Sequence, residues 1–178
     1  MRRALYFLGI LDDQDVAWMM AHGRKLTMAP GDHLIRQGEP ADSLFFVLDG
    51  AFTVYTAAAP RVAELRAGDV VGEISFVDAR PPSASVRADV ESKVGAIPRT
   101  ALQARLTEDV GFAARFYQSI AVFLADRLRT TTGHLGGGPQ LSEDIEDADE
   151  LASHLMASIA MAGLRFTEMQ RGRWGRQA

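Results

Sequence analysis

The segment spanning residues 26–98 restricts the fold most, because short apolar and β-branched runs alternate there with turn residues. Alternation with a period of two is typical of strands that bury one face. Asp49 and Gly50 separate two of these runs and give the clearest hairpin signal, since glycine readily adopts positive φ. The predicted strands are 25–28, 33–36, 43–48, 52–56, 62–66, 70–72, 83–88 and 92–97.

Eight short strands in about seventy residues predict an antiparallel β-roll. The fold class is therefore α+β and mainly β: an eight-stranded jelly-roll, or cupin-like double-stranded β-helix, with flanking helices and a long C-terminal helix. Asp12 and Asp13 predict the start of a helix that ends near His22. Pro98 suits the start of a helix over 99–106, and Thr107 is the expected cap of the next one.

The long helix over 110–128 carries apolar residues at intervals of four and three, which is a heptad pattern. This seam consists of Val110, Ala114, Tyr117, Ala121, Leu124 and Leu128. Phe116, Ile120 and Phe123 supply a second apolar face. The seam has two interpretations, packing on the roll or pairing with a second copy, and the second face favours a homodimer through 110–128.

The chain divides into three parts: a domain over 1–132 with the roll at 25–98 and helices at 99–132, a glycine-rich linker at 133–139, and a helix with a basic tail at 140–178. Apolar positions over 141–166 recur at helical spacing. That face needs a partner in this chain or another, so a protein partner is one expectation.

Composition narrows the classes of function. The 178 residues include no cysteine, which excludes disulfides, thiol catalysis and thiolate metal sites. The net charge of −4 provides no general attraction to nucleic acid or anionic lipid. No window approaches the roughly 20 apolar residues that span a bilayer, and the N-terminus lacks a signal-peptide cleavage pattern. We expect a cytoplasmic protein that does not bind membranes.

Residues 71–86, with the sequence VGEISFVDARPPSASV, resemble the phosphate-binding cassette of the cyclic nucleotide-binding domain family. Segments 29–32, 37–39, 42–50 and 124–128 also match the family pattern, so the similarity extends over about 26–129. The resemblance implies a regulatory sensor like the effector domain of the catabolite activator protein, and not an enzyme. It implies no cofactor other than a ligand such as cyclic AMP or cyclic GMP.

The same resemblance implies which residues contact the ligand. Gly72 lets the backbone approach a ribose, and Glu73 accepts a hydrogen bond from a sugar hydroxyl. Ile74 and Ser75 belong to a helical turn expected over 74–77, whose N–H groups face an anion. From the following strand, Ser83 and the N–H of Ala84 add donors.

The sequence departs from the family at Pro82, where an arginine normally clamps the cyclic phosphate. Proline offers neither a charge nor an N–H. Losing two charge-assisted hydrogen bonds is expected to weaken cyclic-nucleotide binding by roughly 100-fold or more. Arg87 faces the other side of a regular strand, so Arg80 is the candidate substitute.

Residues near the end of the long helix often contact the base in this family. Thr131 and Thr132 fall in that region, next to Thr130. The competing interpretation is a helix end that frays before the glycine run.

Other kinds of site lack support in the sequence. The histidines are isolated and show no metal-ligand spacing, which argues against a cupin-like metal enzyme; they are His22, His33, His134 and His154. The acidic run 142–150 lacks the glycine of a calcium loop and suits a helix start. We predict no catalytic and no metal-binding residues. Direct DNA binding is not expected, because about forty residues after the long helix hold one helix and a basic tail, with no recognition helix.

Two hypotheses remain. In the first, a β-roll binds a small anionic ligand and signals through the long, dimerising helix. In the second, the pocket is degenerate because of Pro82, and the chain is a ligand-free scaffold for protein interaction or dimerisation.

Overall fold

The computed structural model describes residues 2–78, 80–135 and 148–175. Its strands form two four-stranded antiparallel sheets, in the orders β1-β8-β3-β6 and β2-β7-β4-β5. The strands are β1 (Arg24–Met28), β2 (His33–Ile35), β3 (Ser43–Asp49), β4 (Ala51–Tyr55), β5 (Ala63–Arg66), β6 (Val70–Val71), β7 (Ser85–Ala88) and β8 (Ser92–Pro98). The eight-stranded roll predicted from the sequence is confirmed.

The two corners with the sequence Gly-Asp use the same chemistry. The Asp32 side chain accepts the N–H of Ala29, and the Asp69 side chain accepts the N–H of Arg66, both at 2.8 Å. Each aspartate thereby closes a turn on a residue three positions earlier in the chain. Because each bond joins residues three positions apart, both turns depend on the local sequence.

The central strand β3 is buried on both faces, which explains its continuous apolar run. Phe45 and Val47 pack between the two sheets, against residues such as Phe52. Leu44 and Phe46 belong to a second core cluster, between the sheet and the helices.

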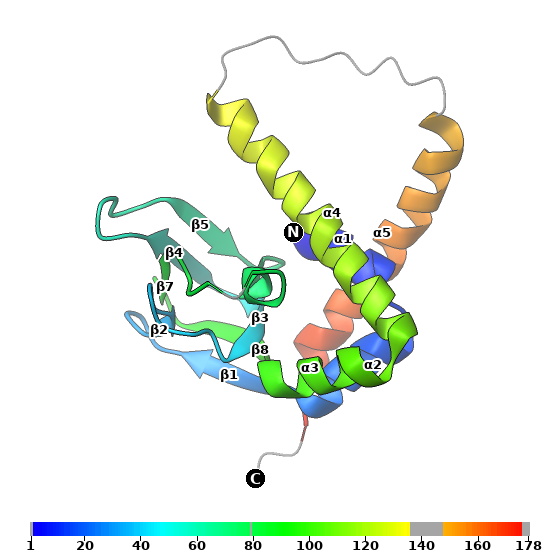
Figure 1. The fold of residues 1–178 in the computed structure, drawn as a ribbon, viewed down its shortest axis with the longest axis horizontal. Coiled ribbons are helices and arrows are strands. Elements are labelled where there is room, and N and C mark those ends of the chain that lie inside the picture. The colour runs from blue at the N-terminus through cyan, green and yellow to red at the C-terminus, as the bar shows by residue number, and fades with distance from the viewer. Residues whose placement is uncertain (1, 79, 136–147, 176–178) are drawn as a thin grey trace.

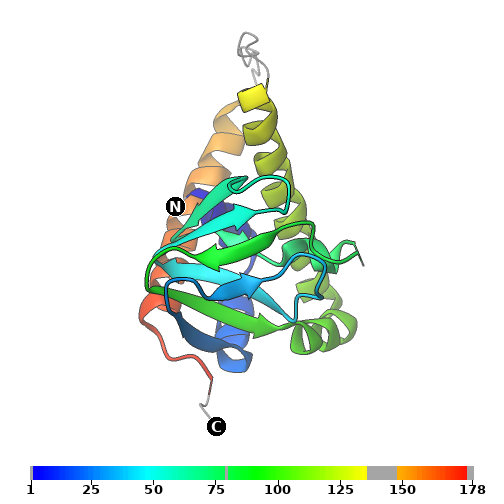
Figure 2. The ribbon, with the colours of Figure 1, turned by 90° about the vertical axis from the view of Figure 1, so that its left-hand side faces the viewer.

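The helices cover the outer face of the β1-β8-β3-β6 sheet. They are α1 (Arg2–Ile10), α2 (Asp13–His22), α3 (Arg99–Glu108), α4 (Val110–Leu135) and α5 (Ala148–Arg171), with a short 3₁₀ helix, η1 (Glu73–Phe76). Figure 1 shows the roll on one side and the helices on the other, and in Figure 2 the roll lies in front of the helices. In the described ranges, no helix is long and apolar enough to cross a membrane.

Helix α1 was not predicted from the sequence. Its Phe7 makes edge contacts with Phe46, Phe116 and Phe123, with ring centroids 5.6 to 6.4 Å apart. Phe7 thus joins α1 to the sheet and to α4. A nine-residue helix is marginal in isolation, so this packing accounts for its stability better than local propensity does.

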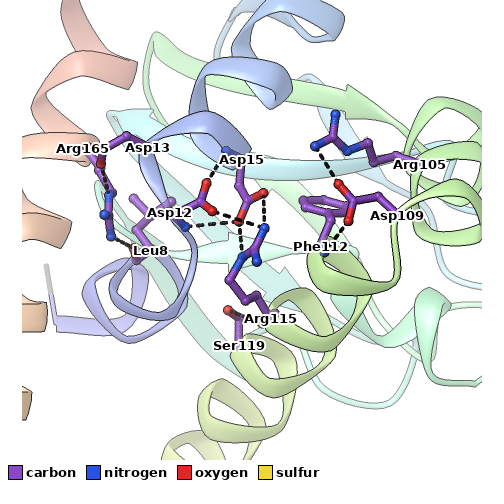
Figure 3. Close-up of polar contacts among 10 residues, drawn as sticks. All are labelled: Leu8, Asp12, Asp13, Asp15, Arg105, Asp109, Phe112, Arg115, Ser119 and Arg165. Atoms are coloured by element: carbon purple, nitrogen blue, oxygen red, sulfur yellow. Dashed lines mark hydrogen bonds and ion pairs between the residues drawn. The ribbon is translucent and has the colours of Figure 1, made fainter.

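The N-terminus of α2 carries a capping box. Asp12 accepts the N–H of Asp15, and the Asp15 side chain accepts the N–H of Asp12, at 2.8 and 3.0 Å. The buried Asp15 carboxylate also receives two hydrogen bonds from Arg115 of α4, at 2.6 and 2.9 Å, as Figure 3 shows. The predicted helix start is therefore also the point where α2 is attached to α4.

The predicted cap of the long helix is wrong. Thr107 lies within α3, where its hydroxyl donates to the Gln103 carbonyl. Asp109 takes the capping position instead: its side chain accepts the N–H of Phe112 at 2.9 Å (Figure 3). An aspartate two residues later outcompetes the threonine because α3 continues to Glu108. Helix α4 then runs to Leu135, past the expected start of the linker at Gly133.

The described apolar face of α5 packs within its own chain. Ala162, Phe166 and Met169 are buried in the cluster that also contains α1, α2 and α4 residues. Arg165 bonds both the Asp13 carboxylate at 2.7 Å and the Leu8 carbonyl at 2.9 Å (Figure 3). The partner that the sequence left open is, for this part of α5, the chain itself. Residues 141–147 lie outside the described residues.

The segment after α5 is anchored by an aromatic side chain. Trp174 lies over Gly95 of β8, where any Cβ would overlap the indole ring. Its Nε1 donates to the Met169 carbonyl at 2.8 Å. The start of the basic tail is thus attached to the roll and to α2 as far as Gly175, whose N–H donates to Met20 O at 2.9 Å.

Candidate functional site

The cassette begins with a tight turn after β6. Gly72 has φ of +92°, and a Cβ on it would lie 2.6 Å from the Ser43 carbonyl oxygen. Only glycine fits both conditions without strain. The turn leads directly into η1, and the Ser75 hydroxyl donates to the Gly72 carbonyl at 2.7 Å. The helical turn predicted from the sequence is present, one residue earlier than expected.

A cavity of about 370 Å³ opens beside this turn. Its volume lies in the range of small-molecule sites, roughly 300 to 1,000 Å³. The structure brings together there the predicted ligand residues Gly72, Glu73, Ile74, Ser75, Arg80, Ser83 and Ala84. Ile35, Ala41, Val54, Val71 and Val86 form an apolar wall, and Asp78, Pro81, Pro82 and Arg127 complete the lining. The cavity is open, not filled by side chains.

Glu73 is the buried charged group of the site. Its side chain is 1% exposed, and its Oε1 accepts a hydrogen bond from Nη1 of Arg127 at 2.8 Å. Burial raises the pKa of this carboxyl above its ordinary value, and the positive charge of Arg127 offsets only part of that effect. The ionised form of Glu73 is therefore stabilised by Arg127, its partner from α4.

Arg80 is at the rim of the cavity. Its Nε donates to the Asp78 carboxylate at 2.7 Å, and its side chain is 86% exposed. The pKa of Asp78 is lowered by hydrogen bonds from Arg80, chiefly from its backbone N–H and then from its side chain. The guanidinium expected to substitute at Pro82 is bound to a neighbouring acid on the surface. Pro82 itself lines the cavity, and its carbonyl accepts the N–H of Gly38 at 2.9 Å.

The sequence did not identify Arg127 or Asp78 as residues of the site. Arg127 falls in the segment 124–128 that matches the family, but its distance from Glu73 depends on how α4 packs. The side chains of Thr131 and Thr132 lie outside the described residues. Within the described ranges, no three histidine or acidic side chains gather as a metal site would require.

The cassette contacts α4 at a second point. The Phe76 ring meets Phe116 edge-on, with centroids 5.5 Å apart. The Arg99 guanidinium lies over the Phe76 ring, 5.8 Å from its centroid. Two side chains of η1, Glu73 and Phe76, are therefore attached to the long helix.

Comparison with known proteins agrees with this geometry. Residues 25–109 match the sequence profile of the family described as "Cyclic nucleotide-binding domain". A cyclic nucleotide-binding domain from Methylobacillus flagellatus superposes with a TM-score of 0.65 at 20% identity, covering 79% of this chain and 88% of that one. That likeness concerns the fold alone.

Two curated relatives match over shorter segments. The regulatory subunit of cAMP-dependent protein kinase from Emericella nidulans is 31% identical over 70 residues, which are 39% of this chain and 17% of that protein. Glutaminase 1 of Bradyrhizobium diazoefficiens is 31% identical over 102 residues, 57% of this chain and 16% of that protein. The chain thus spans less than a fifth of these relatives. Residues 25–109 are thus similar to a cyclic nucleotide-binding domain, and domains of that class are regulatory, non-catalytic modules.

Proposed function

We propose that this protein is a regulatory sensor that binds a small ligand in the cavity beside Gly72 and transmits its occupancy to α4. The observation that carries this proposal is the Glu73–Arg127 bond, because it joins the floor of the cavity to the long helix. A ligand that bonds to Glu73 competes with or reorganises this contact. It thereby binds two arrangements of α4 unequally, which is the condition for a signal.

The ligand expected from the family is a small anion, cyclic AMP or cyclic GMP. The cassette supports a ligand of that shape, while Pro82 carries no charge and both arginines that are described in the cavity lining, Arg80 and Arg127, are bonded to carboxylates. We therefore predict weak binding of cyclic nucleotides. We keep the expectations that the protein is not an enzyme, needs no cofactor or metal, and works in the cytoplasm.

Hydrogen–deuterium exchange tests the proposal. The full chain is measured alone and with millimolar cyclic AMP, cyclic GMP and the four common ribonucleosides. We expect at least one compound to change the exchange of 72–78 together with that of 110–128, because Glu73 and Phe76 connect these segments. A compound that protects the cassette and leaves α4 unchanged would contradict the transmission step, and the absence of any binding would contradict the sensor.

We further propose that two copies pair through the heptad face of α4. Val110 is 80% exposed and Tyr117 is 46% exposed, with exposed Ala114 and Ala121 on the same seam. The opposite face is buried in its own chain through Phe116 and its neighbours, and Leu124 of the seam also packs against this core, so the exposed seam residues are the ones that remain for a partner. An apolar stripe at heptad spacing suits a second identical helix.

Light scattering tests the dimer with a matched pair of variants. V110E/Y117E places two charges on the seam, and V62E/V90E places two charges at exposed positions of the roll. We expect the first variant to have the mass of a monomer and the second to keep the mass of a dimer. A monomeric wild type, or a dimer unaffected by V110E/Y117E, would exclude this interface.

The second candidate function is a ligand-free interaction scaffold, and Pro82 at the clamp position favours it. In one form of such a scaffold, the helix over 141–166 binds a protein partner. Ala162 and Phe166 are already buried in this chain, so neither of them is available for such a contact. Binding of any compound in the exchange experiment would rule the scaffold out.

A further inference from the structure

The charges that line the cavity are paired with one another. Among the described residues of the lining, the charged side chains are Glu73, Asp78, Arg80 and Arg127. Arg127 bonds to Glu73 at 2.8 Å and Arg80 bonds to Asp78 at 2.7 Å. The formal charges sum to zero, with one negative partner for each positive one.

A cyclic phosphate needs a cation that it does not find here. Moving an anion from water into a partly enclosed site is unfavourable unless the anion is paired with a cation and hydrogen-bonded there. To use Arg127, the phosphate would take it from Glu73 and leave a carboxylate that is 1% exposed without its cation. Burial already raises the pKa of this carboxyl, so Glu73 would become still less favourable as an anion.

The groups that the cavity does offer suit a different ligand. The Glu73 carboxylate only accepts hydrogen bonds, so the ligand atom that reaches it must be a donor such as a hydroxyl. The cavity lining also includes Ser83 and the Gly72 turn, which supply neutral polar groups. Ile35, Val54 and Val86 form the apolar wall, against which a flat ring packs.

We propose that the cavity selects an uncharged nucleoside-like ligand, with a hydroxylated ring at Glu73 and a heteroaromatic ring on the apolar wall, over a cyclic nucleotide. This inference rests on the proposed sensor function and specifies the ligand class of the same site. A neutral ligand that donates to Glu73 reorganises the Glu73–Arg127 contact but leaves the two charges paired, so it needs no extra cation.

Calorimetric titration of the full chain tests the preference with matched pairs: adenosine against cyclic AMP and guanosine against cyclic GMP. We expect at least one nucleoside to bind about tenfold or more tightly than its own cyclic nucleotide, with an affinity that changes little between low and high salt. If the cyclic nucleotide of each pair binds more tightly, the ligand class is wrong and the sensor stands. If no compound binds at millimolar concentration, the sensor function fails as well.

The variant Pro82→Arg supplies the missing cation and reverses the preference. We expect cyclic-nucleotide affinity to rise by roughly 10- to 100-fold, while nucleoside affinity stays within about threefold. Pro82→Gln, which has similar reach and no charge, is the control and should leave both affinities near the wild-type values. Equal gains for the nucleoside and the cyclic nucleotide in P82R would show that charge does not govern selection, and would overturn the inference.

Discussion

At the scale of single residues, two positions of the cassette determine its shape and its electrostatics. Gly72 places the backbone in a conformation that other residues adopt only with strain. Glu73 follows immediately and brings a charge into a buried position. The two neighbours therefore respond to mutation for different reasons, one steric and one electrostatic.

Gly72→Ala is expected to lower the free energy of unfolding by about 1 to 3 kcal/mol, because alanine is strained at positive φ and its Cβ would lie 2.6 Å from Ser43 O. Urea denaturation measures the change. Gly163→Ala in α5 is the control: no atom lies within 4 Å of its Cβ position, and we expect a small gain from helix propensity. Equal effects at the two glycines would contradict the account of the turn.

Arg127→Leu is expected to lower the free energy of unfolding at neutral pH by about 2 to 4 kcal/mol, because it leaves the Glu73 carboxylate buried without its cation. Glu73→Gln should be milder, since an amide needs no counter-charge. Urea denaturation of both variants measures the difference. If R127L were no less stable than E73Q, the ion pair with Arg127 would not be what stabilises the Glu73 carboxylate.

The pH dependence of the same pair has a definite sign. Burial raises the pKa of Glu73 above 4.5, so the folded chain holds its proton at a pH where the unfolded chain has released it. The free energy of unfolding of the wild type, relative to E73Q, should therefore fall as pH rises from 4.5 through the folded-state pKa. Denaturation at several pH values checks this, and a flat or rising difference would contradict it.

At the scale of the elements, the N-terminus of α2 holds three helices together. Asp15 bonds to Arg115 of α4, and Asp13 bonds to Arg165 of α5 (Figure 3). Asp15 is buried and Asp13 is mostly exposed. Although the two ion pairs look alike, their contributions to stability should differ.

Asp15→Asn is expected to lower the free energy of unfolding by about 2 kcal/mol at neutral pH, because Arg115 then lacks its buried carboxylate. Burial alone would raise the pKa of Asp15, but bonds from Arg115 and the Asp12 N–H outweigh it and lower the pKa below 3.8. The contribution is thus present above pH 3.8 and lost as pH falls through the folded-state pKa.

Chemical denaturation of D15N at pH 7 and below pH 3.8 measures this contribution. Asp13→Asn is the matched control, because its side chain is 71% exposed, and it should change the free energy of unfolding by less than about 1 kcal/mol. A larger loss in D13N than in D15N would mean that α5, and not α4, is the helix that this turn secures.

At the scale of the whole molecule, α5 completes the helical layer that covers the roll. The cluster that holds Ala162, Phe166 and Met169 also contains Phe7, Phe46 and residues of α4. Figure 1 shows α4 and α5 diverging from this cluster, with α1 between them. Helix α5 is therefore part of this layer and not a separate domain, so removing it exposes the core of the helical layer.

Ending the chain at residue 147 is expected to lower the free energy of unfolding by on the order of 5 kcal/mol, because buried side chains on both sides become exposed. Thermal unfolding and binding of a hydrophobic dye measure the effect. Ending the chain after Gly175 is the control and should keep the wild-type melting temperature. An unchanged melting temperature without α5 would mean that the helix is not part of this core.

The sequence by itself determined the features that depend on neighbours along the chain. The strands of the roll, its glycine and aspartate corners and the turn at Gly72 follow from local patterns of side chains and backbone conformation. The residues of the cassette came from the resemblance of 71–86 to a known family, and they line one cavity in the structure.

The tertiary structure alone decided the contacts between distant segments. Arg127 meets Glu73 across 54 positions of sequence, and Arg115 meets Asp15 across 100. Short helices such as α1 are stable only where apolar side chains from elsewhere cover them, so their own residues give little signal. The position of α5 and the neutral charge balance of the cavity also depend on such contacts. Packing and charge pairing are set by distance in space and not by separation along the chain.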